Sequence, residues 1–286
     1  MLELISEHAC FDGVQRFYRH PSAAIGLPMR FSVFLPPQAL TGKVPALFYL
    51  AGLTCTEETF MAKAGAQRVA AQLGMMLIAP DTSPREANLP GETHSWDMGV
   101  GAGFYVDATE APWDRHYRMY SHILELYALV VREFPVQPDR IGIFGHSMGG
   151  HGALVLALRN PDLFKTVSAF APVCAPSQSH WGIKAFSAYL GDNQERWQQY
   201  DASALMERRT TPFPGGILID QGLSDKFLPD QLFPQVFEAA CQKAQQPLEL
   251  RRHAGYDHGY YFISTFVEDH LRFHCRKLTS NMDYLS

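Results

Sequence analysis

The stretch RIGIFGHSMGGHGALVLALRN (residues 140–160) decides the fold. It begins with an apolar run typical of a buried strand and ends in an Ala- and Leu-rich run typical of a helix. Between them stands Gly145-His146-Ser147-Met148-Gly149, which matches the G-x-S-x-G pattern of a sharp turn from strand to helix. Such a turn strains its central residue and requires small residues two places before and after it. The stretch therefore predicts a nucleophilic serine, Ser147, exposed at the end of a strand.

The same alternation of strand and helix extends to both sides of this turn. Short apolar runs predict strands, and 3.6-residue periodicity predicts helices between them. The predicted strands cover 45–52, 75–80, 140–146, 166–172, 215–222 and 248–255, and the predicted helices cover 57–73, 121–134, 152–160, 232–244 and 260–278. This order is typical of an α/β fold, with a mostly parallel central sheet and helices on both faces.

Two regions depart from the alternation. Residues 1–40 contain MRFSVFLPP and predict antiparallel strands at the edge of the sheet. Residues 173–214 are rich in Pro, Ser, Gln and Trp, contain one short helical stretch, and predict a small loop-rich cap over the site. Because no linker-like segment divides the chain, we expect a single domain over residues 1–286.

Composition excludes several classes of partner. The 286 residues are 47% hydrophobic and have a formal net charge of -5, which disfavours binding to nucleic acid or anionic lipid. No uncharged apolar run approaches the length of a membrane span, and the N-terminus lacks the pattern of a secretory signal, so we expect a cytoplasmic location. Metal and nucleotide motifs are missing, no cofactor is expected, and the five cysteines predict reduced thiols.

A serine hydroxyl becomes a strong nucleophile only when a histidine removes its proton and an acid orients that histidine. His258 lies in the loop GYDHG, which follows the last predicted strand, where α/β sheets place their chemistry. Five other histidines lie on the turn itself, within a strand or on the terminal helix: His146, His151, His253, His270 and His274. We therefore assign the base to His258.

The acid is expected in the loop after the penultimate strand. The segment GILIDQGLSDKFLPD offers Asp220, Asp225 and Asp230, of which Asp220 is still in the strand and Asp230 resembles a helix N-cap. We prefer Asp225, with Asp220 as the alternative, and interpret Asp257 as a turn residue. Backbone amides would stabilise the oxyanion that forms when an acyl carbon is attacked. The best placed are those of Met148, after the nucleophile, and Leu53, in the loop after the first parallel strand.

Segments spread over most of the chain resemble the S-formylglutathione hydrolases, also called the esterase D family. They are AGLTCTEETF (51–60), SWDMGVGAGFYVDATEAPW (95–113), IFGHSMGGHGAL (143–154), WGIKAFSAYLG (181–191), DQGLSDKFL (220–228) and GYDHGYYF (255–262). Carried over by position, the resemblance implies the triad Ser147, Asp225 and His258 and an oxyanion hole at Leu53 and Met148. It also implies that Cys55 lies beside the site and that Trp181 lines the pocket, with Trp96 and Phe104 as weaker candidates.

The resemblance further implies an α/β-hydrolase fold, a homodimer, and hydrolysis of S-formylglutathione to glutathione and formate in formaldehyde detoxification. The substrate would be a small molecule, and short acyl esters would also be hydrolysed. Three alternatives stay open at this point. They are a general short-chain carboxylesterase, an acyltransferase that passes the acyl group to an alcohol, and a catalytically silent protein of the same fold.

Overall fold

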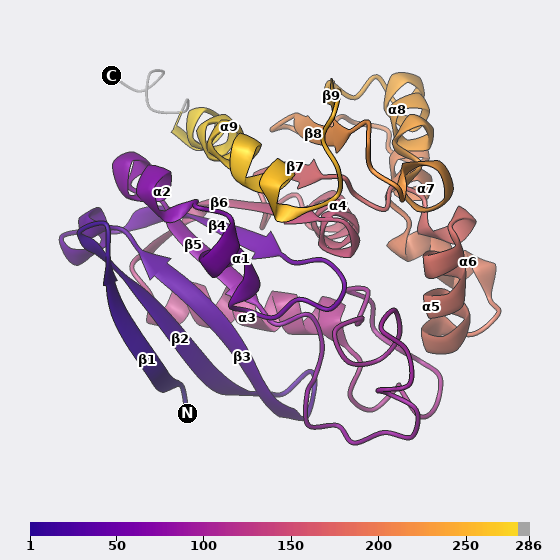
Figure 1. Cartoon of the computed structure of the whole chain (residues 1–286), viewed down its shortest axis with the longest axis horizontal. Coiled ribbons are helices and arrows are strands. Elements are labelled where there is room, and N and C mark those ends of the chain that lie inside the picture. Colours follow the sequence, from indigo (N-terminus) through magenta and orange to yellow (C-terminus); the bar gives the residue numbers. More distant parts are fainter. Residues whose placement is uncertain (280–286) are drawn as a thin grey trace.

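Within residues 1–279, which the computed structural model describes, nine strands form one sheet in the order β1-β2-β3-β5-β4-β6-β7-β8-β9 (Figure 1). The strands are β1 (Glu3–Cys10), β2 (Gly13–Ser22), β3 (Leu27–Leu35), β4 (Val44–Leu50), β5 (Met76–Pro80), β6 (Val136–His146), β7 (Thr166–Phe170), β8 (Ile217–Gly222) and β9 (Leu248–His253). From β5 through β4 to β9 every neighbouring pair is parallel. The predicted α/β class is confirmed.

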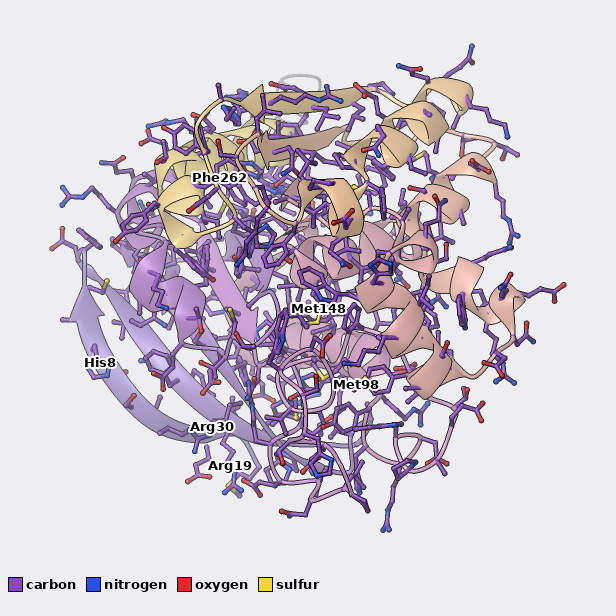
Figure 2. The ribbon with its side chains drawn as sticks, turned by 45° about the vertical axis from the view of Figure 1, so that its right-hand side comes forward. His8, Arg19, Arg30, Met98, Met148 and Phe262 are labelled. Carbon is purple, nitrogen blue, oxygen red and sulfur yellow. The ribbon has the colours of Figure 1, made fainter. Side chains whose placement is uncertain are left out.

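The N-terminal strands form the antiparallel end of the sheet. β1 pairs with β2, β2 with β3, and β3 with β5, all antiparallel. The turn between β1 and β2 consists of Phe11 and Asp12, which both have positive φ, as a tight two-residue hairpin requires. Figure 2 shows this end of the sheet through its labelled side chains His8, Arg19 and Arg30. The predicted antiparallel edge strands are confirmed.

Helices cover both faces of the parallel half. They are α1 (Thr59–Lys63), α2 (Gln67–Leu73), α3 (Met119–Glu133), α4 (Met148–Arg159), α8 (Pro234–Lys243) and α9 (Tyr260–Thr279). On β7, Thr166 hydrogen-bonds to His274 of α9, whereas a side chain at Gly150 of α4 would contact Ala169. Because side chains at positions 166 and 169 point to opposite faces of a strand, α9 and α4 lie on opposite sides of the sheet.

The helix predicted over 57–73 is broken in two. α1 ends at Lys63 and α2 begins at Gln67, and between them Gly65 has a φ of +69°, which a continuing right-handed helix does not allow. The predicted end at residue 73 is confirmed, because Gly74 closes α2 in the left-handed conformation. α4 starts four residues before the predicted 152, since the helix leaves directly from the strained turn.

The excursion over residues 173–214 is more helical than its composition indicates. It contains α5 (His180–Leu190), α6 (Gln194–Trp197) and α7 (Ala202–Glu207), where one short helix was expected (Figure 1). Ser179, Asn193 and Asp201 each accept a hydrogen bond from a backbone N–H in the first turn, which explains the three starts. Residues 280–286 of the predicted 1–286 domain lie outside the described residues, and the single domain stays a prediction.

Candidate active site

The predicted functional residues follow the carboxyl ends of parallel strands. Loop 51–56 follows β4, Ser147 follows β6, Asp225 follows β8, and His258 follows β9. Because the strands are parallel, these ends meet at one edge of the sheet. Segments more than 200 residues apart in the sequence are therefore brought together by strand direction alone.

Ser147 occupies the strained turn that the sequence predicts. Its backbone has φ 58° and ψ -119°, and the residue is only 3% exposed. Its N–H donates to the carbonyl of Phe170 over 3.0 Å, and its own carbonyl accepts from His151 N–H over 3.0 Å. A Cβ atom at Gly149 would collide with the carbonyl of Leu50. The surrounding backbone thus holds the serine in a conformation that its own preferences disfavour.

His258 and Asp225 form a direct pair. Nδ1 of His258 lies 2.5 Å from Oδ2 of Asp225, whose side chain is fully buried. The other carboxylate oxygen accepts from the backbone N–H of Phe227 over 2.8 Å, and Gln221 Nε2 approaches Oδ2 at 3.4 Å. A carboxylate bound at Nδ1 leaves Nε2 of the imidazole free to act on a hydroxyl, and both His258 and Ser147 line one pocket.

Asp220, the alternative acid, is engaged elsewhere. Arg251 donates to both of its oxygens over 2.6 Å, and His270 Nε2 lies 3.2 Å from Oδ2. Burial opposes ionisation of this carboxyl, but the hydrogen bonds from His270 and Arg251 outweigh that effect and lower the pKa of Asp220. Asp257 accepts from Gly259 N–H within its own turn, as its interpretation as a turn residue requires.

The pocket has a volume of about 230 Å³. It is lined by Gly52, Leu53, Cys55, Thr59, Lys63, Trp96, His146, Ser147, Trp181, Phe227, His258 and Tyr260. Trp181 packs edge-on against Trp96 at 5.6 Å between ring centroids and lies 4.6 Å from the ring of Phe227. These aromatic rings give the pocket an apolar wall. Phe104, expected as a weaker candidate, is instead fully buried and does not line the pocket.

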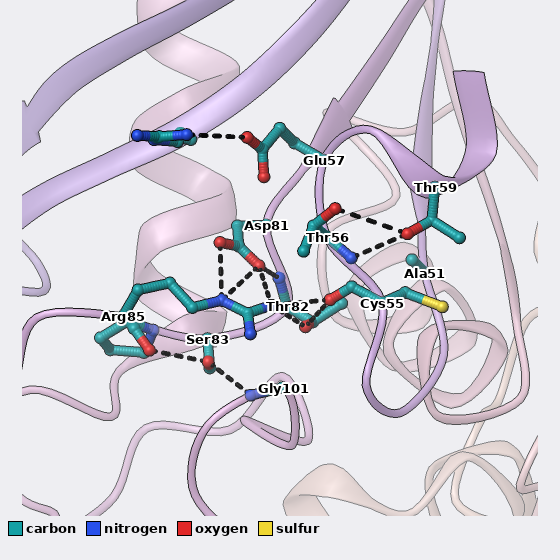
Figure 3. A network of polar contacts seen from close by, with 12 residues as sticks. Ala51, Cys55, Thr56, Glu57, Thr59, Asp81, Thr82, Ser83, Arg85 and Gly101 are labelled. Atoms are coloured by element: carbon teal, nitrogen blue, oxygen red, sulfur yellow. Dashed lines mark hydrogen bonds and ion pairs between the residues drawn. The ribbon is translucent and has the colours of Figure 1, made fainter. Parts of the chain in front are cut away.

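Side-chain hydrogen bonds hold the loop that carries Leu53 (Figure 3). The carbonyl of Cys55 accepts from Thr82 Oγ1 over 2.6 Å and from Arg85 Nη2 over 2.8 Å. Thr54 N–H donates to the carbonyl of Gly101 over 2.9 Å, so the glycine-rich loop 99–103 also supports this loop. Among residues 1–279, the N–H of Leu53 has no acceptor within the protein.

The second predicted oxyanion donor is the N–H of Met148, the first residue of α4. The opening amides of a helix have no carbonyl one turn earlier to bond, and they carry partial positive charge. Met148 is fully buried, and Figure 2 shows it in the middle of the molecule, away from the labelled residues of the antiparallel strands. Both amides are therefore available to a ligand atom beside Ser147.

His146, on the turn next to Ser147, lies close to the proposed base His258. Its ring centroid is 4.4 Å from that of His258, and it lines the pocket. Burial, together with the neighbouring His258, lowers the pKa of His146 well below its usual value, so the ring is neutral. Neither ring nitrogen has a hydrogen-bond partner in the described part of the chain.

Cys55 lies in the pocket wall rather than in the core. It is partly buried, and all five cysteines are free thiols, which is the state that the sequence predicts. Burial raises the pKa of its thiol, so the neutral form is favoured at pH 7. Sequence reasoning missed the pocket residues Thr59, Lys63 and Tyr260, because the first two fall in a stretch interpreted as helix and the third begins α9.

The described part of the chain has neither a candidate metal cluster nor a helix that could span a membrane. Residues 1–279 contain no cluster of His, Cys, Asp and Glu side chains that could hold a metal ion. Across the same residues, no helix is both long and apolar enough to cross a bilayer.

A strained serine after a parallel strand, with a histidine and a carboxylate delivered by later strands, defines a serine hydrolase of the α/β-hydrolase fold. The model of the Esterase family, described as "Putative esterase", matches residues 22–273. The S-formylglutathione hydrolase of Mus musculus is 52% identical over 284 residues, covering 98% of this chain and 99% of its own. The enzyme of Rattus norvegicus is 51% identical over 281 residues, with the same coverage.

Solved structures agree with these relatives. An S-formylglutathione hydrolase from Agrobacterium tumefaciens has a TM-score of 0.93 and 46% identity, covering 96% of this chain and 99% of its own. A ferulic acid esterase at 20% identity and a TM-score of 0.69, covering 94% and 100%, shares the fold. The chain belongs to the Esterase family, within the group of S-formylglutathione hydrolases.

Proposed function

We propose that this chain hydrolyses S-formylglutathione to glutathione and formate through a covalent intermediate on Ser147. The observation that carries the proposal is the hydrogen bond between His258 and Asp225 at 2.5 Å, beside a pocket that also contains the strained Ser147. The printed names of the relatives in Mus musculus, Rattus norvegicus and Agrobacterium tumefaciens supply the substrate.

In the first step His258 removes the proton of Ser147 Oγ, and the oxygen attacks the formyl carbon. The imidazole becomes charged, and the carboxylate of Asp225, bonded at Nδ1, stabilises that charge and fixes the ring. Negative charge develops on the carbonyl oxygen. The amides of Leu53 and Met148 would bind this oxygen, and each such donor is typically worth about 2.7–4 kcal/mol in the transition state.

In the second step the tetrahedral intermediate collapses. The bond between carbon and sulfur breaks, and the glutathione sulfur leaves with the proton that His258 holds. Water then enters, His258 takes one of its protons, and the resulting attack on the serine ester releases formate and restores Ser147. The chemistry needs only acid–base and nucleophilic groups, all of which this chain supplies.

The pocket suits a small acyl group. Its volume of about 230 Å³ is modest, and Trp181 and Phe227 close it with apolar surface. We assign Trp181 to the acyl-binding wall and place Cys55 beside the acyl group. A long acyl chain would need space that these rings fill.

Two measurements test the proposal. A short p-nitrophenyl ester should give a burst of p-nitrophenol, and intact-mass analysis should find the acyl group on Ser147. Full activity in Ser147→Ala would reject the assignment.

Comparing kcat/KM for S-formylglutathione with that for matched formyl and acetyl esters then tests the substrate. Equal values would favour a general short-chain carboxylesterase, and formation of a new ester on addition of an alcohol would favour an acyltransferase.

We further propose that the protein acts as a cytoplasmic homodimer in formaldehyde detoxification. The similarity to the S-formylglutathione hydrolases over nearly the whole chain supports this context. Light scattering coupled to size-exclusion chromatography should give twice the chain mass of 32.1 kDa. A mass of one chain at micromolar concentration would refute the dimer.

A further inference from the structure

One lysine lies in the wall of the candidate active site without a carboxylate partner. Of the residues that line the pocket, Lys63 is the one whose side chain carries a fixed charge. None of the ion pairs formed within residues 1–279 involves it. Its Nζ lies 5.8 Å from the centroid of the Tyr260 ring, which also lines the pocket. The charge is therefore held at the pocket by an aromatic neighbour.

A second lysine has a similar environment. Nζ of Lys226 lies 4.9 Å from the centroid of the Phe227 ring, and that ring is 5.0 Å from the ring of His258. Lys226 also forms no ion pair within the described residues. Lys184, on the neighbouring helix α5, is different, because Asp97 binds its ammonium group over 2.5 Å. Two unneutralised cations thus flank the pocket of a chain whose formal net charge is -5.

We propose that Lys63 binds a carboxylate of the thiol portion of the substrate, and that Lys226 adds a second attractive charge. This inference rests on the proposed function, since glutathione carries two carboxylates and one ammonium group and is a net anion. The formyl group itself is neutral and gives a lysine nothing to bind. The lysines therefore act on the part of the substrate that distinguishes a glutathione thioester from a simple ester.

This role predicts a particular kinetic pattern. The carboxylates of glutathione lie several bonds from the reacting carbonyl, so their contact with Lys63 is the same in the ground state and the transition state. Loss of such uniform binding raises KM and leaves kcat unchanged. Lys63 also favours the thiolate of Cys55 electrostatically, an effect that would act equally on charged and neutral substrates. Comparing the two kinds of substrate separates these roles.

The experiment compares Lys63→Met, Lys63→Glu and the control Lys184→Met with the unmodified protein. The substrates are S-formylglutathione and p-nitrophenyl acetate, which has no charge. For Lys63→Met we expect KM for S-formylglutathione to rise about tenfold, as for a charge pair at a partly solvated interface, with a larger rise for Lys63→Glu. The specificity for S-formylglutathione relative to p-nitrophenyl acetate should fall about tenfold in Lys63→Met, and Lys184→Met should behave like the unmodified protein on both substrates.

A second measurement does not depend on which substrate is hydrolysed. Glutathione should inhibit hydrolysis of p-nitrophenyl acetate competitively, and its inhibition constant should rise about tenfold in Lys63→Met. Unchanged inhibition in this variant, or an equal loss of activity on both substrates, would overturn the role of Lys63. Failure of the unmodified protein to hydrolyse S-formylglutathione would instead overturn the proposed function, while the inhibition measurement would still decide on the lysine.

Discussion

Replacing Arg85 by methionine should weaken both the fold and the proposed oxyanion hole. Arg85 Nη2 donates to Oδ1 of Asp81 over 2.6 Å and to the carbonyl of Cys55 over 2.8 Å (Figure 3). Through the second bond it holds the loop that positions the N–H of Leu53. Methionine keeps most of the length of the side chain but removes both the charge and the donors.

The magnitude follows from the burial of the two partners. The Asp81 side chain is 3% exposed, so the variant leaves an almost buried carboxylate whose remaining bond in this network is the N–H of Thr82. Breaking a buried ion pair costs about 3–5 kcal/mol, but Arg85 is 33% exposed and water can enter its place. We therefore expect a loss of about 2–3 kcal/mol in the free energy of unfolding.

The catalytic effect should be smaller than the loss of a complete oxyanion donor. Thr82 Oγ1 still donates to the carbonyl of Cys55, so this carbonyl loses one of its two side-chain hydrogen bonds. Removal of a whole donor costs about 10²–10³ in kcat, and we expect about a tenfold fall here. The value of KM should change little, because the oxyanion exists only in the transition state.

Urea unfolding and steady-state kinetics on a p-nitrophenyl ester measure the two effects. The double variant Asp81→Asn/Arg85→Met is the matched control, because it removes the unpaired charge of Asp81 as well as the hydrogen bond from Arg85 to the carbonyl of Cys55. It should regain stability but not kcat. A fall in stability with kcat unchanged in the single variant would refute the link between Arg85 and the oxyanion hole, and recovery of kcat in the double variant would assign the effect to the charge of Asp81.

Three further changes test other parts of the structure. Asp225→Asn should lower kcat by about 10³–10⁴-fold with KM nearly constant, as measured on S-formylglutathione, because it disturbs the orientation of His258. Gly149→Ala should lower the melting temperature by several degrees through its clash with Leu50, whereas Gly42→Ala, which meets no atom within 4 Å, should not. Burial lowers the pKa of His151 from 6.5 to about 4. As pH falls below 6.5, the unfolded chain therefore binds a proton at position 151 before the folded chain does, and the free energy of unfolding falls. This effect should cost the unmodified protein about 2 kcal/mol between pH 7 and pH 5, and His151→Gln should lack this part of the loss. Urea unfolding at the two pH values measures this difference. An equal fall in the free energy of unfolding in the unmodified protein and in His151→Gln would contradict the assignment to His151.

Strand ends and local turn chemistry account for what the sequence predicts well. The elbow was predictable because Gly145 and Gly149 are imposed by close backbone contacts with neighbouring segments. The loops of Asp225 and His258 were predictable because parallel strands must end at the same edge of the sheet. The order of elements along the chain and the direction of each strand are enough to place both loops.

Features that depend on packing between distant segments were not predictable in this way. β5 lies between β3 and β4, out of sequence order, because strand order depends on which edges pair in space. Lys63 and Tyr260 reach one pocket from two helices, and no local pattern marks either of them. The break at Gly65 was not predictable either, since an isolated glycine within a periodic stretch does not by itself end a helix.

The charge balance around two buried aspartates supports His258, rather than His270, as the proposed base. Arg251 already neutralises Asp220, so His270, which shares that carboxylate, gains little from becoming charged. Asp225 has no Lys or Arg partner among the described residues, and His258 is its basic neighbour. When His258 takes the proton of Ser147, the new charge therefore meets an uncompensated carboxylate in a buried setting, where charge pairing is strongest. The two aspartates therefore differ in charge balance as well as in position. Asp220 on β8 lies opposite Arg251 on β9 in the sheet, which places the arginine beside it.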